Sequence, residues 1–553
     1  MGIRWVAQSG MEGRRAEIAL RFGLSRTAAL LLAVRFPDDE GIEEYLDPSR
    51  VEWPSPLRIP HLSEAADRVV RAVRAGEKIF IHGDYDVDGL MGAAVLTGAL
   101  RTLGASPDVY IPSRFEGGYG LSESSVSAAL SGSASLVLTT DCGTNAREAG
   151  ADLARHGVDL VVTDHHVPSP DQQPPGWIVN PHMEPDHPDR ALCGTLVALQ
   201  LVRRVGDLLG RPLSLEPFVR LGAIATVADV SPLTPLNRRV CREGFAALAT
   251  TPNLALARMF KAAGANGRIM GHHIAFHIAP RLNAAGRIED ARLVLDLLLE
   301  RDAARAAALS GRLEGLNRKR RALQAAAYDD ASARVRENPE GPVLFVASGR
   351  WHRGVLGPVA ARLAESFRKS AFVVSVEGGI GTGSARSWGG ENVVALLERC
   401  SDLLLRYGGH GGAAGFSVEA DKIPALEKRV QAEAAERSPD APAPVAYIPI
   451  LPDDVPGLWD AWEVMDPFGP LNDEPTVGIE GLYAKGCRVL NGKHLMWEAE
   501  AGGGQRLTVI AWDGLGRGLS PSSLTPSALV IGKPAPEQRP VALPFYLNLL
   551  DIC

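Results

Sequence analysis

The sequence predicts an α/β protein with two α/β domains joined by a long helix and followed by a C-terminal β-barrel of the OB type. Three observations predict this arrangement. Strand-like apolar runs alternate with helical stretches from Lys78 to about Arg287, and again from Val343 to about Glu436. An alanine-rich, polar segment with leucines at helical spacing separates these two regions. Short alternating runs follow a linker rich in proline and alanine.

The boundaries of the predicted segments follow from these changes of pattern. An amphipathic helix from Leu62 to Val73 is expected to pack on the first sheet. The segment from Ser438 to Pro444 has the composition of an extended linker. We therefore expect a helical leader, a first α/β domain, a connecting helix, a second α/β domain and an OB-like β domain, at residues 1–55, 56–288, 289–338, 339–437 and 445–553.

The most informative motif follows the apolar run Ile79–Ile81 and reads His82-Gly83-Asp84-Tyr85-Asp86-Val87-Asp88-Gly89. Alternate residues of an extended segment share a face, so the aspartates and His82 are expected to converge. Crowded carboxylates oppose one another's ionisation unless a cation holds them. Oxygen ligands with some imidazole suit Mn2+ or Mg2+. A metal site is thus one interpretation, and an aspartate-rich turn closed by Gly89 is the other.

Ligand-type residues follow three more apolar runs. Leu136–Thr140 leads into Asp141, Leu160–Thr163 leads into Asp164-His165-His166, and Ala223–Ala228 leads into Asp229. Each residue taken singly fits a helix cap, a turn or a polar core position. In open α/β sheets, however, functional groups gather at the carboxyl ends of the strands. The joint occurrence predicts that four strand ends supply one site.

In this order the motifs resemble those of the DHH phosphoesterases. Four further motifs narrow the resemblance to the single-stranded-DNA-specific exonucleases of the RecJ type. These motifs are Pro280–Arg287, Trp351–Gly357, Gly383–Ser387 and Gly408–Phe416. The resemblance covers nearly the whole chain and implies 5′→3′ hydrolysis of single-stranded DNA in repair and recombination.

The resemblance also implies two neighbouring cations, Mn2+ or Mg2+, bridged by Asp141. One cation would be held by His82, Asp86 and Asp141, and the other by Asp88, Asp141, His165 and Asp229. Two catalytic residues are implied beside these ligands: Asp84 would orient a ligand, and His166 would lie next to the scissile phosphate. Two such cations would activate a water and stabilise the attacking and leaving oxygens.

Several arginines stand among glycines and alanines, where little side-chain bulk separates a guanidinium from a phosphate. Around His410, near-bare backbone would let a phosphate chain approach closely. Together with the motifs above, these features predict a set of substrate-binding residues: Arg114, Arg281, Asn283, Arg287, His352, Arg353, Ser384, Arg386 and His410. In the β domain, Tyr483, Trp497 and Trp512 are candidates for base stacking, with a core position as the alternative for each.

Composition constrains the setting of the protein. The chain has 553 residues and a net charge of −7, and its six cysteines include no C-x-x-C pair. We therefore expect neither a disulfide framework nor a zinc knuckle. The apolar run Ala28–Val34 is too short to span a bilayer, so a cytoplasmic protein with no membrane association is expected. The negative charge does not exclude nucleic acid, because bound cations and clustered arginines supply a local positive field.

Partners and alternatives complete the prediction. The resemblance implies a monomer that acts on single-stranded DNA, with a single-strand-binding protein and a RecQ-type helicase as partners. The connecting helix has a basic side, which is either solvated or faces DNA, and its residues are Arg312, Arg318, Lys319, Arg320 and Arg321. Two other functions stay open: a DHH-type phosphoesterase of short oligonucleotides or other small phosphate substrates, and a non-catalytic replication scaffold.

Overall fold

The computed structural model describes residues 5–8, 10–113, 120–265, 267–337, 340–436, 444–501, 504–525, 527–536 and 545–553. The chain divides into two compact units. The first unit comprises residues 1–110, 119–279 and 443–553, and the second comprises residues 111–118 and 280–442. The N-terminal and C-terminal parts of the chain thus belong to the same unit.

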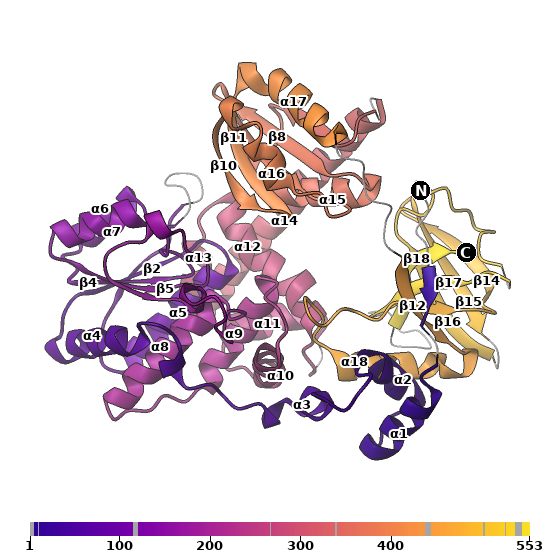
Figure 1. The fold of residues 1–553 in the computed structure, drawn as a ribbon, viewed down its shortest axis with the longest axis horizontal. Coiled ribbons are helices and arrows are strands. Elements are labelled where there is room, and N and C mark those ends of the chain that lie inside the picture. The colour runs from indigo at the N-terminus through magenta and orange to yellow at the C-terminus, as the bar shows by residue number, and fades with distance from the viewer. Residues whose placement is uncertain are drawn as a thin grey trace. The chain divides into compact units, whose positions relative to one another are not determined.

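A parallel sheet of five strands forms the base of the first unit, in the order β3-β2-β4-β5-β6. Its strands are β2 (Ile79–Gly83), β3 (Asp108–Tyr110), β4 (Leu136–Thr140), β5 (Asp159–Thr163) and β6 (Trp177–Val179). The central strands are mostly apolar because helices cover both faces. Helices α6 (Glu123–Ser131) and α7 (Arg147–Arg155) cover one face, and α4 (Leu62–Ala75), α5 (Val87–Thr102) and α8 (Gly194–Leu208) cover the other (Figure 1). The amphipathic helix predicted from Leu62 is confirmed as α4.

Only helices follow this sheet within the first unit up to residue 279, as far as the chain is described. After the short 3-10 helix η4 (Pro181–Met183) and α8, they are α9 (Glu216–Ala228), α10 (Pro235–Ala249), α11 (Leu254–Ala262) and a π-helix, η5 (His273–Ile278). The prediction of a strand at Ala223–Ala228 is therefore wrong, because these residues form the last turns of α9. A short apolar run fits a buried helix as well as a strand, and Pro217 in the first turn favours the helix.

The C-terminal region forms a mixed sheet of eight strands in the order β1-β12-β13-β17-β18-β16-β15-β14. The strands are β1 (Trp5–Ala7), β12 (Val445–Ile450), β13 (Val477–Ile479), β14 (Tyr483–Leu490), β15 (His494–Ala501), β16 (Gln505–Ala511), β17 (Val530–Pro536) and β18 (Phe545–Ile552). Among the described strands no pairing joins β14 to β1, so the predicted OB-type barrel is not confirmed. Trp497 is fully buried in the core of this sheet and is not available for base stacking.

The leader shares a core with this C-terminal sheet. It contains β1 and the helices α1 (Glu12–Phe22), α2 (Arg26–Arg35) and α3 (Ile42–Leu46). Strand β1 pairs in parallel with β12. The apolar residues of α2 pack with α18 (Leu458–Met465) and with the inner side of the sheet, where Trp497 lies. In the described part of the chain, no helix combines the length and the apolar character that crossing a bilayer requires.

The second unit contains a five-stranded sheet in the order β10-β11-β9-β8-β7. Its strands are β7 (Leu344–Ser348), β8 (Ala371–Glu377), β9 (Ile380–Arg386), β10 (Leu404–His410) and β11 (Ala413–Glu419). Helices α14 (Ala303–Glu337) and α15 (Leu356–Phe367) pack against β7 and β8 on one face. Helices α16 (Val393–Glu398) and α17 (Ile423–Ala435) cover the opposite face. Strands β9, β10 and β11 carry the glycine-rich motifs Gly383–Ser387 and Gly408–Phe416.

The connecting segment, predicted as one helix over residues 289–338, is formed by two helices, α13 (Arg292–Leu299) and α14. Helix α12 (Ala279–Ile288) precedes them, and α14 begins only at Ala303. Glu300 has extended backbone, and its side chain accepts hydrogen bonds from the main-chain nitrogens of Arg301 and Asp302. These local hydrogen bonds replace the helical ones and explain why a single helix does not form.

Candidate metal centre and phosphate pocket

The carboxyl ends of β2, β4 and β5 gather the predicted ligands in the first unit. Strand β2 ends at Gly83, and the chain turns sharply at Asp84 into helix α5. The turn requires glycine at position 89, since a Cβ atom there would lie 2.5 Å from the main chain of Asp84. Asp86 is the N-cap of α5, and its side chain accepts from the Gly89 nitrogen at 3.1 Å.

This turn corrects one step of the sequence argument. The aspartates do not lie on one extended face, because Asp88 belongs to the first turn of α5. Asp84 and Asp86 lie with Asp141, whereas Asp88 lies with His165 and Asp229. A third group joins Asp141, His165 and His166. In each group one ligand atom per residue lies within 4.8 Å of the others, and Asp141 and His165 each belong to two groups.

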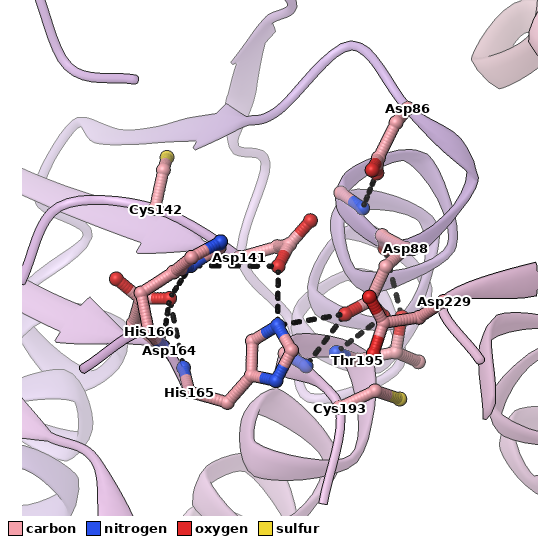
Figure 2. A network of polar contacts seen from close by, with 12 residues as sticks. Asp86, Asp88, Asp141, Cys142, Asp164, His165, His166, Cys193, Thr195 and Asp229 are labelled. Atoms are coloured by element: carbon pink, nitrogen blue, oxygen red, sulfur yellow. Dashed lines mark hydrogen bonds and ion pairs between the residues drawn. The ribbon is translucent and has the colours of Figure 1, made fainter. Parts of the chain in front are cut away.

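Asp141 and His165 are the point where the groups meet (Figure 2). Nε2 of His165 lies 3.1 Å from Oδ1 of Asp141 and 3.8 Å from Oδ2 of Asp88. Asp141 has a φ of 60°, a backbone conformation that is uncommon for a residue with a side chain. Gly194 packs directly against it, since a Cβ atom on Gly194 would lie 2.7 Å from the Asp141 Cα. The backbone around Asp141 is therefore held by close packing.

Helix α8 fixes the position of Asp88. The main-chain nitrogens of Gly194 and Thr195, in the first turn of α8, donate to the two carboxylate oxygens at 2.7 and 2.9 Å. The Thr195 hydroxyl also donates to the Asp88 carbonyl oxygen at 2.8 Å. The positive end of the helix dipole stabilises a carboxylate placed in this way. No local pattern predicts this contact, because Asp88 and Thr195 lie 107 positions apart in the sequence.

Asp164, like Thr195, is not among the site residues predicted from the sequence. It is buried, and Oδ1 accepts from Nδ1 of His166 at 2.7 Å, while Oδ2 accepts from the Thr144 nitrogen at 3.0 Å. Burial alone would lower the pKa of His166, but the hydrogen bond to Asp164 raises it to about 9. The pKa of Asp164 is held below its usual range against the effect of burial, chiefly by the same hydrogen bond. The sequence signal for Asp164 is its place in the motif Asp164-His165-His166, directly before two predicted site residues.

The electrostatics of the centre favour bound cations. Burial and the neighbouring Asp88 raise the pKa of Asp141 well above its usual value and that of Asp229 to about 6. Burial and Asp88 also raise the pKa of Asp86. Divalent cations would relieve this crowding of carboxylates. The donor set of carboxylates and imidazoles therefore fits Mn2+ or Mg2+.

His82 lies on β2 and is completely buried. The candidate ligand groups do not include it. Its ring stacks on Tyr110 with 5.6 Å between the centroids, and among the described residues neither ring nitrogen has a hydrogen-bond partner. Burial lowers the pKa of His82 to about 4, against a smaller opposing effect of the Gly120 backbone. A neutral imidazole with an available nitrogen is the form that binds a metal.

The second unit holds a pocket of about 360 Å³ on the face of its sheet. Arg287, Arg353 and Arg386 line it, together with Ser384. Glycine at position 357 leaves room for the Arg386 guanidinium, because a Cβ atom there would lie 2.9 Å from Nη2 of Arg386. The pocket thus brings together four of the predicted substrate-binding residues, with the guanidinium and hydroxyl donors that suit a phosphate.

Two histidines of the second unit, His352 and His410, each accept a hydrogen bond at Nδ1 from the main-chain nitrogen two residues later. The Gly354 nitrogen donates to Nδ1 of His352 at 3.0 Å, and the Gly412 nitrogen donates to Nδ1 of His410 at 3.2 Å. Each neutral ring must then carry its proton on Nε2, so each offers a donor there.

The remaining predicted substrate-binding residues lie elsewhere. Arg281 on α12 forms an ion pair with Glu314 at 3.0 Å, and Asn283, on the same helix, is half-buried. Neither lines the pocket. Arg114 lies outside the described residues.

Two family models match this chain, one over the region of the metal centre and one over the region of the phosphate pocket. Residues 78–220 match the model of the DHH family, N-terminal domain, and residues 340–436 match that of the DHHA1 domain. The single-stranded-DNA-specific exonuclease RecJ of Thermus thermophilus is 37% identical over 472 residues, which cover 85% of this chain and 68% of the relative. RecJ of Bacillus subtilis is 32% identical over 501 residues, which cover 88% of this chain and 62% of the relative. The chain thus spans about two thirds of the length of these relatives.

Solved structures give the same result. The crystal structure of RecJ from Thermus thermophilus in complex with Mn2+ superposes with a TM-score of 0.84 at 32% identity, covering 100% of this chain and 79% of that one. The complex of the same protein with Mg2+ gives a TM-score of 0.78 at 30% identity, covering 99% of this chain and 78% of that one. The predicted resemblance and the predicted choice of Mn2+ or Mg2+ are therefore confirmed.

Proposed function

Because the chain belongs to the RecJ family of DHH-domain proteins, we propose that it is a metal-dependent exonuclease that hydrolyses single-stranded DNA. The observation that carries this proposal is the set of carboxylate and imidazole groups that meet at Asp141 and His165. The relatives at 37% and 32% identity are named for this activity. A non-catalytic scaffold would not need to keep this set of ligands.

The proposed ligand assignment follows the resemblance. One divalent cation is held by His82, Asp86 and Asp141, and the other by Asp88, Asp141, His165 and Asp229. When bound, the two cations activate a water and stabilise the attacking and leaving oxygens of an in-line displacement. Asp84, clustered with Asp86 and Asp141, orients these ligands.

The residues of the chain then have separate tasks. The α8 nitrogens hold the Asp88 carboxylate in place through two hydrogen bonds. His166, kept protonated by Asp164, donates to an oxygen of the scissile phosphate. A positioned cationic donor stabilises the charge that develops on that phosphate. Asp164 therefore acts on the reaction through His166.

The pocket of the second unit is proposed to anchor the terminal phosphate. Arg287, Arg353 and Arg386 supply the charge, and Ser384 supplies a hydroxyl donor. The Nε2 donors of His352 and His410 would contact the same group or its neighbour. The further substrate contacts proposed from the sequence are Arg114, Arg281 and Asn283. Removal of nucleotides in the 5′→3′ direction rests on the family resemblance.

For the C-terminal sheet we propose an OB-like role in binding the strand. Trp512 is 45% exposed and meets His494 edge to face, with 5.0 Å between the ring centroids. An exposed aromatic beside an imidazole suits base stacking. Partnership with a single-strand-binding protein and a RecQ-type helicase belongs to the same proposal.

The decisive experiment compares single strands of increasing length, labelled at the 5′ or the 3′ end, with and without Mn2+. We expect hydrolysis only with the metal, mononucleotide release from the 5′ label, and a kcat/KM that rises with length. Hydrolysis that is fastest on dinucleotides and no faster on longer strands would instead identify a small-substrate phosphoesterase. A protein that binds strands but leaves them intact with Mn2+ would contradict the enzyme proposal.

A further inference from the structure

The floor of the phosphate pocket is the open face of three antiparallel strands, β9, β11 and β10. Directly opposite residues on such strands project to the same face. The pairing places Arg386, Ala413 and His410 in one row across the sheet. Ser384, Gly415 and Gly408 form the next row. The pocket lining includes Arg386, Ala413, Ser384 and Gly415, which confirms that these rows face it.

The third row contains Thr382, Ser417 and Arg406. Thr382 still lines the pocket, whereas Ser417 and Arg406 extend the same face beyond it. The register of this row is continuous with the first two rows, because the irregularity in β10 lies between Leu404 and Arg406. Arg406 therefore projects from the edge strand to the same side as Arg386. The alternate residues of β11, Phe416 and Val418, are buried on the opposite side, as this alternation requires.

Arg406 differs from Arg399 and Arg429, two ion-paired arginines of the same unit. It is exposed, and its side chain has no ion pair or hydrogen bond within the described ranges. Arg399 forms an ion pair with Glu433 at 2.6 Å, and Arg429 lies 3.5 Å from Asp402. An arginine without a carboxylate partner retains its full charge and all its donors for a ligand.

The surface between the pocket and Arg406 is bare. A Cβ atom on Gly408 would meet nothing within 4 Å, and one on Gly415 would have only the Gly383 oxygen at 4.0 Å. Thr382 and Ser417 add hydroxyl groups beside this floor. Beyond Ser417, the next residue of β11 on this face is Glu419, an acid that forms an ion pair with Lys422 at 2.6 Å. The phosphate-compatible surface therefore ends at the row of Arg406.

From this arrangement we propose that Arg406 binds a second phosphate group of the substrate, beyond the one held at Arg386. The row of Arg406 lies about 13 Å along the strands from that of Arg386, and β10 lies about 10 Å across from β9. The inference rests on the proposed function, because it assigns the ligand of the same pocket. The second phosphate comes either from the nucleic acid backbone or from a polyphosphate at the strand end.

The test uses Arg406→Ala and Arg406→Lys in an Asp141→Asn background, so that binding is measured without hydrolysis. The matched control is Arg429→Ala, an exposed arginine on α17, which covers the opposite face of the sheet. Affinities are measured for 5′-monophosphorylated strands of two to twelve nucleotides and for a 5′-triphosphorylated dinucleotide. Salt dependence is measured for the longest strand.

We expect Arg406→Ala to weaken binding about three- to tenfold and to reduce the salt slope by about 0.7, the value for one phosphate contact on a single strand. Arg406→Lys should recover most of the slope. A loss that appears only as the strand lengthens assigns the backbone phosphate, and a loss confined to the triphosphorylated dinucleotide assigns the end group. Affinities and slope equal to those of Arg429→Ala for every substrate would overturn the proposal.

Failure of the proposed function would look different. The otherwise wild-type protein, with Asp141 intact, would then leave single-stranded DNA uncleaved in Mn2+, and the inference about Arg406 would fall with it. If that protein degrades single strands and Arg406→Ala matches the control, only the role of Arg406 is rejected.

Discussion

Nδ1 of His166 lies 2.7 Å from Oδ1 of Asp164, so the last residue of the D-H-H motif is held by the first. The same carboxylate accepts from the main-chain nitrogens of His165 and His166 at 2.7 and 3.2 Å. Asp164 therefore fixes both the backbone turn and the ring that follows it. This arrangement separates the residue that positions from the residues proposed to bind metal.

Asp164→Asn should lower kcat by at least about tenfold, because the amide no longer stabilises a protonated His166. KM should change less than kcat, since the substrate contacts of the second unit are untouched. Steady-state kinetics on a 5′-phosphorylated strand measure both constants. Asp171→Asn is the control, because Asp171 is an exposed aspartate in the short 3-10 helix Pro170–Gln172. Equal losses in the two variants would contradict the positioning role.

Asp141→Asn should abolish hydrolysis while single-strand binding persists, because it removes the charge shared between the two ligand groups. Isothermal titration with Mn2+ should show weaker binding of the metal. Retention of two tight Mn2+ sites together with near-normal turnover would exclude Asp141 as the bridging ligand. Cys142→Ser is the control, because the Cys142 thiol is buried and only approaches the Thr140 carbonyl oxygen at 3.6 Å.

Asp330 on α14 should influence the pocket through Trp351. Nε1 of Trp351 donates to Oδ2 of Asp330 at 2.9 Å, and Trp351 directly precedes His352 and Arg353. Asp330→Leu should raise KM about three- to tenfold and reduce the preference for 5′-phosphorylated ends, with a smaller effect on kcat. Asp329→Leu alters the exposed neighbour on the same helix and should leave the preference unchanged. A loss of stability without a loss of end preference would show a structural role only.

His272 should make the first unit less stable in acid. Burial lowers its pKa to about 3, with smaller effects of His273 and His277 in the same direction. The unfolded chain binds a proton near pH 6.5 and the folded chain does not, so stability is lost as the pH falls below 6.5. His272→Phe should flatten the dependence of unfolding free energy on pH by about 1.4 kcal/mol per pH unit between pH 6 and 4. Denaturant titrations measure this slope, and the exposed His156 provides the control variant His156→Gln.

Leu31 on α2 tests the shared core of the leader and the C-terminal sheet. It is 1% exposed, so Leu31→Ala should destabilise this core by about 2–5 kcal/mol. Limited proteolysis should then cut the C-terminal sheet before the parallel sheet. Leu20→Ala removes a leucine that is 88% exposed on α1 and should have little effect. An unchanged cleavage pattern would mean that the C-terminal sheet is stable without the leader.

The parts of the site that local patterns encode could be predicted from the sequence. The strands that end shortly before Asp141 and His165 have a clear signature, since buried parallel strands are largely continuous apolar runs. Asp229 was placed near the site for the wrong structural reason, because the run before it is helical. The contacts of Asp88 with Gly194 and Thr195 join residues more than 100 positions apart, and no local periodicity reports such a contact.

Strand β1 has a consequence for the order of folding during synthesis. Trp5 pairs with Val445, which the ribosome adds 440 residues later. At about 5–20 residues per second, the leader waits about 20–90 s for its partner strand. During that interval the apolar side chains of α2 lack the C-terminal part of the core in which they are buried. The leader therefore reaches its native environment only after β12 has been made, and until then it is a segment that chaperones would have reason to protect.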